Sequence, residues 1–203
     1  MFVPTAPALP APSLHELLLR RAQERPEAIA LDHLDPASGV RNTRSYRELL
    51  ALADQLATGL VGRGVGQGDC VAWLGLNHPL QIAALFALGR LGAVLVPLNH
   101  RLAAAEWAAV LADCTPRLLV HDAGFAEAAR ALCHAPDRPR AALQETLATG
   151  DVHTAVPDAT TDAQAEPVLL VYTSGTTGTP KAAVHTQGNL LANMAMAAQA
   201  QGM

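Results

Sequence analysis

Residues 172–181, YTSGTTGTPK, combine the groups that bind phosphate. Five serine or threonine side chains, two glycines, a proline and a lysine occur within these ten positions. Backbone N–H groups of glycine approach oxygen atoms closely because no Cβ intervenes, and serine and threonine hydroxyls add donors that rotate. A lysine adds a compact charge with three N–H donors, and a proline stiffens the exit of the loop. The segment therefore predicts a loop that binds a polyphosphate.

Lys181 is distinctive in the composition of the whole chain. It is the only lysine, and the other thirteen cationic side chains are arginines. An ammonium group contacts phosphate as a point charge, whereas a guanidinium binds through a planar fork. We therefore predict that Lys181 binds phosphate.

The loop differs from the P-loop of kinases and NTPases. That pattern is GxxxxGK followed by Ser or Thr, and it opens a helix. Here Gly175 and Gly178 are three positions apart, Ala182 follows Lys181, and a strand is expected next. A P-loop phosphotransferase is therefore the least favoured of the functions considered. The GxGxxG dinucleotide fingerprint is also absent from this loop, and the glycines of GRGVGQG at 62–68 follow a helix, so they are interpreted as a helix stop.

Alternating elements must position this loop. Buried strands are expected at 70–75, 93–98 and 117–122, and helices at 80–91, 104–113 and 124–133. Runs of apolar residues without alternation favour strands that are covered on both faces. The pattern predicts an α/β fold with a doubly wound, mostly parallel sheet and flanking helices. A strand at 167–174 leads into the loop, a strand at 182–186 follows it, and a helix runs from about Asn189 towards Met203.

The first part of the chain is predicted to form two helices around a hairpin. Residues 1–12 are expected to be a loose tail. Ser13 with Glu16, and Ser45 with Glu48, have the spacing of capping boxes that begin helices. Strands at 28–34 and 40–46 lie between these helices. Residues 134–166 lose all periodicity and are interpreted as a connector.

The segment YTSGTTGTPKAAVHTQGNL resembles the phosphate-loop signature of the adenylate-forming (AMP-binding) superfamily. SYRELLALADQLATGLVGRGVGQGDCVAWL and GAVLVPLNHRLAAAEWAAVLADCTPRLLV are similar to upstream stretches of the same family. The resemblance covers residues 13–203 and is weakest in the 134–166 connector. One departure is Ala182, where the family usually has glycine. The resemblance implies an incomplete large N-terminal domain, and it favours an acyl-CoA synthetase of fatty acid metabolism.

The resemblance also implies a reaction. A small-molecule carboxylic acid attacks the α-phosphate of ATP to give an acyl-adenylate and pyrophosphate, and a thiol, commonly coenzyme A, then takes the acyl group. Mg²⁺ and preorganised donors stabilise the charge that grows on pyrophosphate. By resemblance, the residues that contact the β- and γ-phosphates are Thr173, Ser174, Gly175, Thr176, Thr177, Gly178 and Lys181. The resemblance also implies that Lys181 is a catalytic residue.

The resemblance places other parts of the machinery beyond Met203. These are the aromatic adenine contact, the acidic Mg²⁺ ligand, the aspartate that holds the ribose, the acyl pocket and a small C-terminal domain. We therefore expect the chain to be the amino-terminal part of a ligase and to be unable to complete adenylation alone. The alternative is a non-catalytic module that binds a nucleotide or a partner.

The composition of the chain argues against nucleic-acid binding, a membrane span and a metal site. The net charge is −4 and no basic stripe with interleaved aromatics occurs, so nucleic-acid binding is not expected. The most apolar region, from Pro79, is interrupted by Arg90 and two glycines, so no membrane span is expected. Three distant cysteines without a CxxC pair indicate a reduced, cytoplasmic chain, and no metal site is predicted.

A few residues near the expected strand ends carry alternatives. Asn99, His100 and Arg101 follow a buried strand and are interpreted as a packing and turn segment, with a role in lining a cleft as the alternative. His185 follows the loop and is interpreted as structural, with a position near the ligand as the alternative. The tryptophans Trp73 and Trp107 are expected to be core or half-buried anchors.

Overall fold

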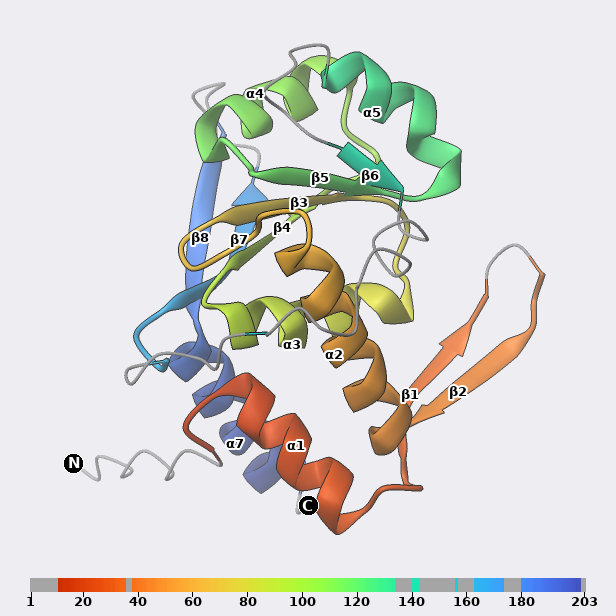
Figure 1. The fold of residues 1–203 in the computed structure, drawn as a ribbon, viewed down its shortest axis with the longest axis vertical. Coiled ribbons are helices and arrows are strands. Elements are labelled where there is room, and N and C mark those ends of the chain that lie inside the picture. Colours follow the sequence, from red (N-terminus) through yellow and green to blue (C-terminus); the bar gives the residue numbers. More distant parts are fainter. Residues whose placement is uncertain are drawn as a thin grey trace.

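A six-stranded sheet forms the centre of the protein (Figure 1). The computed structural model describes residues 11–35, 38–133, 140–142, 156, 163–173 and 180–201. In spatial order the strands are β6 (Arg140–Ala142), β5 (Leu118–His121), β3 (Cys70–Leu74), β4 (Val94–Leu98), β7 (Pro167–Thr173) and β8 (Lys181–Thr186). All neighbouring pairs are parallel except β7 and β8, which are antiparallel. The predicted mostly parallel sheet is confirmed.

Helices cover both faces of this sheet (Figure 1). On one face lie α4 (Ala104–Cys114), a 3₁₀ turn (Ala123–Phe125) and α5 (Ala126–Leu132). On the other lie α2 (Tyr46–Val61) and α3 (Pro79–Leu91), with α1 (Leu14–Glu24) and α7 (Gln187–Gln201) packed beyond them. This two-sided arrangement is the doubly wound architecture predicted from the alternation of strands and helices.

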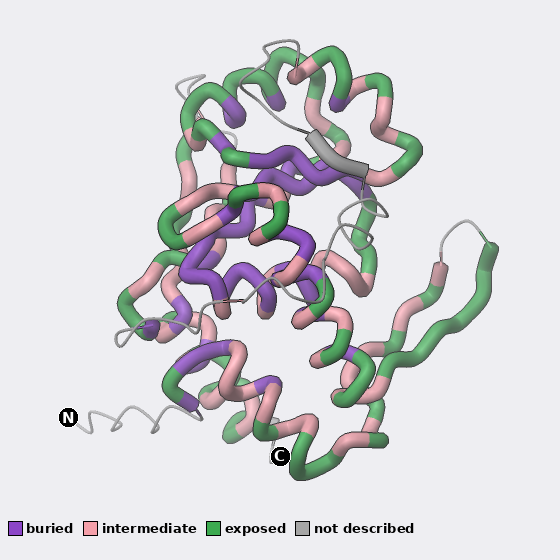
Figure 2. The backbone as a smooth tube through the Cα atoms, in the orientation of Figure 1, coloured by how far each residue is buried: buried purple, intermediate pink, exposed green. Residues whose placement is uncertain are grey.

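The central strand β3 divides its side chains between two cores. Val71 and Trp73 join the cluster against α2 and α3, whereas Ala72 and Leu74 join the cluster against α4. All four are buried, which explains why the sequence of this strand shows no alternation. Figure 2 shows that burial is concentrated in the central strands. The expectation that Trp73 is a core residue is confirmed.

A two-stranded hairpin lies apart from the main sheet (Figure 1). It consists of β1 (Ile29–Leu34) and β2 (Arg41–Ser45), which pair antiparallel as the sequence predicts. Ser45 then caps α2. Its hydroxyl accepts from the backbone N–H of Glu48 at 3.3 Å, and the Glu48 carboxylate accepts from the N–H of Ser45 at 2.8 Å. The second predicted capping box is therefore complete.

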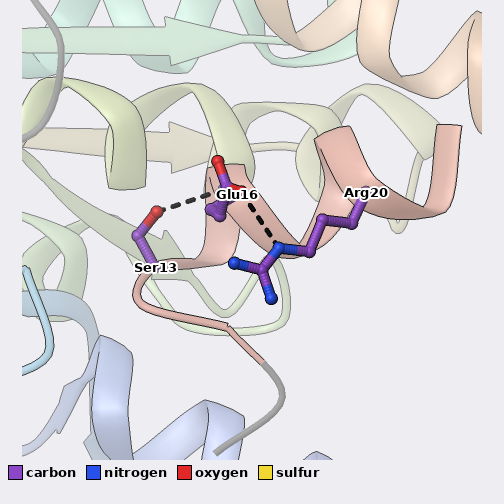
Figure 3. A network of polar contacts seen from close by, with 3 residues as sticks. All are labelled: Ser13, Glu16 and Arg20. Carbon is purple, nitrogen blue, oxygen red and sulfur yellow. Dashed lines mark hydrogen bonds and ion pairs between the residues drawn. The ribbon is translucent and has the colours of Figure 1, made fainter. Parts of the chain in front are cut away.

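The first predicted capping box forms only in half (Figure 3). The Ser13 hydroxyl accepts from the backbone N–H of Glu16 at 3.1 Å, so Ser13 is the N-cap of α1 as expected. The Glu16 carboxylate, however, accepts from Nε of Arg20 at 3.0 Å. A guanidinium one turn along the helix gives this carboxylate a charge-assisted partner, which competes with the neutral backbone N–H.

Two features of the last third differ from the sequence-based expectation. The helix α7 begins at Gln187 rather than near Asn189, because Thr186 and Asn189 bond to each other's backbone N–H groups at 3.1 and 3.2 Å. The predicted connector 134–166 contains the strand β6, which pairs parallel with β5. A strand of three residues is too short to give a periodic signal.

One fully buried polar side chain joins three helices. The Oε1 atom of Gln187 accepts from the backbone N–H of Leu14 at 2.9 Å, and its Nε2 donates to the carbonyl of Gly89 at 3.0 Å. Gln187 opens α7, Leu14 opens α1, and Gly89 lies in the last turn of α3. This glutamine therefore satisfies helix-end groups that have no partner within their own helices.

Within the described ranges, none of the helices combines the length and the apolar character that a membrane crossing requires.

Candidate functional site

The strands β7 and β8 hold the two ends of the predicted phosphate loop together. Thr173 ends β7, Lys181 begins β8, and the two residues are opposite each other in the antiparallel register. The Thr173 hydroxyl donates to the Lys181 carbonyl oxygen at 3.5 Å. Two of the predicted phosphate-binding residues are thus adjacent in space. The other predicted residues, Ser174, Gly175, Thr176, Thr177 and Gly178, lie outside the described residues.

The position of this hairpin favours ligand binding. Because β7 is parallel to β4 and its neighbours, Thr173 lies at the carboxyl edge of the sheet, where open α/β folds bind ligands. The chain continues from Lys181 as a strand and not as a helix. This confirms the strand expected after the loop, which separates the site from a P-loop.

Lys181 is available to a ligand at this edge. Its side chain is exposed, and no ion pair within the described part of the chain involves it. The next residue, Ala182, pairs with Tyr172 across the two strands. Thr115 is the non-glycine residue with positive φ in the described ranges, so Ala182 adopts a backbone conformation that alanine accommodates. The departure from glycine at Ala182 therefore causes no backbone strain.

A pocket lies at the carboxyl ends of β3, β4 and β7. The strands β4 and β7 share one register pair, Leu95 with Leu169, and the pairing stops before Pro97, which has no N–H to donate. Beyond that pair lies this pocket of about 430 Å³, lined on the β4 side by residues 97–102 and on the β7 side by Val171 and Tyr172. The lining also includes Gly75, Asn77 and Gln81 from the segment after β3. The helices that follow the adjacent strands β3 and β4 cover opposite faces, so the topological switch point between β3 and β4 borders this pocket.

The segment after β4 both packs and lines this pocket. The indole Nε1 of Trp107 donates to the carbonyl of Asn99 at 2.9 Å, and the Asn99 side chain accepts from the N–H of Arg101 at 3.0 Å. Asn99, His100 and Arg101 all line the pocket. The structure therefore supports the cleft-lining alternative, while the turn expected from the sequence is held by Trp107, a buried anchor.

Tyr172 is a residue near the loop that the sequence did not single out. Its hydroxyl donates to the Asp113 carboxylate at the end of α4. Burial, and then this hydrogen bond, raise the pKa of Tyr172 well above its usual value. The phenol therefore keeps its proton to higher pH than an exposed tyrosine does. Its position directly before Thr173 was the available signal, but the pairing with Asp113 depends on the packing of α4.

A second pocket, of about 440 Å³, lies between the hairpin and the amino end of α3. Its polar lining includes His33, Asn42, His78 and Asp122. His78 is the N-cap of α3, and its Nδ1 accepts from the N–H of Leu80 at 3.2 Å. The rings of His33 and His78 meet edge to face with centroids 5.9 Å apart. His78 therefore has to stay neutral at Nδ1 to cap the helix.

The surroundings of His78 lower its pKa. Desolvation is the largest cause, and positive charge on His33 and Arg44 acts in the same direction. The carboxylates of Asp122 and Asp35 oppose the shift. A folded-state pKa below the unfolded value of 6.5 favours folding when the imidazole is neutral. This contribution to stability is complete above the unfolded pKa and is lost as the pH falls through the folded pKa.

Replacing His78 with asparagine should remove this pH dependence. Asparagine is a good N-cap and does not titrate in this range. We expect the melting temperature of the wild-type chain to fall more steeply than that of His78→Asn between about pH 7 and about pH 5. His100→Asn, which changes a histidine outside this pocket, should follow the wild type. Equal slopes for wild type and His78→Asn in thermal unfolding would refute the assignment.

Comparison with known proteins identifies the family to which this fold and hairpin belong. The sequence model of the family described as AMP-binding enzyme matches residues 18–203. The chain belongs to this family. The match includes the loop, its two strands and both pockets. The predicted relationship to adenylate-forming enzymes is confirmed.

Individual relatives agree with the family assignment. A feruloyl-CoA synthase from an Amycolatopsis species is 41% identical over 175 residues, which cover 86% of this chain and 33% of that protein. The structure of a putative long-chain-fatty-acid CoA ligase from Rhodopseudomonas palustris aligns with a TM-score of 0.77 and 27% identity, covering 94% of this chain and 48% of that one. The N-terminal domain of FACL13 from Mycobacterium tuberculosis aligns with a TM-score of 0.71 and 30% identity, covering 86% of this chain and 44% of that one.

The chain spans about a third of the length of the relatives that its sequence matches. It corresponds to their N-terminal part, as the FACL13 domain illustrates. In the described ranges, no group of three or more His, Cys, Asp or Glu side chains is arranged to hold a metal ion.

Proposed function

We propose that the chain supplies the triphosphate-binding hairpin of an ATP-dependent acid–thiol ligase, with coenzyme A as the thiol. The observation that carries the proposal is the placement of Thr173 and Lys181. They lie face to face at the carboxyl edge of the sheet, on either side of a segment rich in glycines and hydroxyls. Membership of the AMP-binding family supports the same chemistry. Related proteins named as CoA ligases support the choice of thiol.

In the proposed first step, a carboxylate oxygen of the acid attacks the α-phosphorus of ATP. The bond from that phosphorus to the oxygen bridging the α- and β-phosphates breaks, and pyrophosphate leaves with the electron pair. Negative charge therefore grows on the β- and γ-phosphates. The Lys181 ammonium and the Thr173 hydroxyl are the described groups placed to stabilise it, and Mg²⁺ enters bound to ATP. Ser174, Gly175, Thr176, Thr177 and Gly178 are proposed as further donors.

The acid is proposed to be one with an apolar body. Relatives carry names that include feruloyl-CoA synthase, indoleacetate–CoA ligase and long-chain-fatty-acid–CoA ligase. These names divide between aromatic and aliphatic acids. The aliphatic preference inferred from sequence resemblance is therefore one of two classes, and both are tested by offering ferulate and a fatty acid to the full-length ligase.

The test of the proposal is calorimetric titration of the 203-residue chain with magnesium pyrophosphate and with MgATP. We expect saturable binding of both, and no carboxylate-dependent exchange of pyrophosphate into ATP by this chain alone. Lack of binding at concentrations of several millimolar, corresponding to less than about 4 kcal/mol of binding free energy, would overturn the proposal. The alternative, a non-catalytic nucleotide-binding module, predicts the same binding but no exchange by any longer product that contains this segment.

A further inference from the structure

We propose that Tyr172 and Asp113 form a positioning pair that fixes the carboxyl end of β7 and thereby places Thr173 for phosphate binding. The proposal rests on the proposed function of the hairpin. It adds a contact from α4, which covers one face of the sheet, to the strand end that carries Thr173. Neither side chain is itself proposed to touch the ligand.

The carboxyl end of β7 is held differently by its two neighbours, because the register pairs with β8 continue to the last residue of β7 and the register pair with β4 does not. On the β8 side, register pairs continue up to Tyr172 with Ala182 and Thr173 with Lys181. On the β4 side, the register pair is at Leu169, three residues before Tyr172. Backbone hydrogen bonds at the end of a strand open more easily where the register pairing continues on one side only.

The bond from Tyr172 to Asp113 ties the end of β7 to the helix that covers this face of the sheet. Asp113 lies in the last turn of α4, and α4 is anchored to the sheet by the buried side chains of Trp107, Val110 and Leu111. The Tyr172 side chain packs against this same core. The phenol therefore connects the end of β7 to a helix that its own apolar contacts hold against the sheet. One peptide unit separates this connection from Thr173.

The pocket beside Tyr172 shows what the bond prevents. The pocket of about 430 Å³ at the carboxyl ends of β4 and β7 is lined in part by Tyr172. Without a fixed hydroxyl the ring has room to rotate, and the register pair between β4 and β7 at Leu169 lies three residues before Tyr172. A phenol keeps its proton throughout the neutral range, so the hydroxyl remains a donor to the carboxylate there. The raised pKa of Tyr172 extends this to higher pH.

The pair can be tested with variants that separate its hydrogen bond from its volume. Tyr172→Phe removes the donor and keeps the ring. Asp113→Leu removes the acceptor. Asp113→Asn keeps a carbonyl acceptor, so it should retain the affinity for magnesium pyrophosphate. Tyr46→Phe is the matched control, because Tyr46 is the other tyrosine of the chain and begins α2.

Two measurements apply to each variant. The first is the affinity for magnesium pyrophosphate by calorimetry. We expect Tyr172→Phe and Asp113→Leu to bind about five- to tenfold more weakly, and Asp113→Asn and Tyr46→Phe to bind within about twofold of wild type. The second is amide hydrogen exchange of 168–173 without ligand, which should rise in Tyr172→Phe and Asp113→Leu while the amides of 70–74 stay protected.

Unchanged exchange at 168–173 in Tyr172→Phe would overturn the positioning pair, whether or not the chain binds pyrophosphate. Wild-type affinity in Tyr172→Phe, or affinity in Asp113→Asn as weak as in Asp113→Leu, would overturn the link between this pair and phosphate binding. Absence of binding by the wild-type chain would count against the proposed function instead. The exchange measurement still decides the pair in that case.

Discussion

Replacement of Lys181 by alanine is expected to weaken the binding of magnesium pyrophosphate and MgATP by at least about tenfold. The ammonium is the positive charge at the mouth of the hairpin, one strand across from the Thr173 hydroxyl. Charge-assisted hydrogen bonds to phosphate are roughly twice as strong as neutral ones, so Lys181 should exceed any single hydroxyl in effect. Titration calorimetry at fixed, moderate ionic strength measures the loss, because salt screens an exposed charge.

The melting temperature should not change in the same variant. Lys181 is exposed, and within the described ranges no ion pair involves it, so its removal leaves no buried group without a partner. Lys181→Arg should bind with intermediate affinity, because the charge is kept and the compact ammonium is lost. Arg44→Ala, which removes an exposed cation from the separate hairpin, should bind like the wild type. If Arg44→Ala and Lys181→Ala weaken binding equally, the effect is one of net charge, and the assignment of Lys181 is wrong.

Replacement of Gln187 by methionine should lower the free energy of unfolding by about 2–4 kcal/mol. The side chain is fully buried and bonds to the N–H of Leu14 and to the carbonyl of Gly89. Both backbone groups belong to helix ends, so neither gains a replacement partner within its own helix. Methionine keeps a similar volume, so the loss reports two unsatisfied polar groups rather than a cavity.

Urea unfolding followed by circular dichroism measures this difference. Gln67→Met is the control, since the Gln67 amide donates to the Glu166 carboxylate at 2.9 Å in an exposed position. An exposed hydrogen bond is replaced by water, so this variant should lose less than about 1 kcal/mol. Equal losses in the two variants would mean that the buried bonds of Gln187 contribute nothing beyond an exposed one.

The elements of the fold could be predicted from the sequence because each depends on neighbours along the chain. Continuous apolar runs gave β3, β4 and β5, and the spacing of Ser45 and Glu48 gave the start of α2. Where a local rule failed, another local partner competed, as Arg20 does for the Glu16 carboxylate. The strand β6 was missed because three residues carry no period.

Part of the candidate site could likewise be predicted from neighbouring residues, and part depends on tertiary contacts. Its phosphate-binding composition is carried by ten consecutive residues, so the sequence by itself determined the predicted chemistry, the family and the strand on each side of the loop. The contacts around it were decided by the tertiary structure. Tyr172 reaches Asp113 across 59 positions, and Gln187 reaches Leu14 across 173. No periodicity spans such separations, because these groups meet only when the sheet order and the packing of α1, α3, α4 and α7 bring them together.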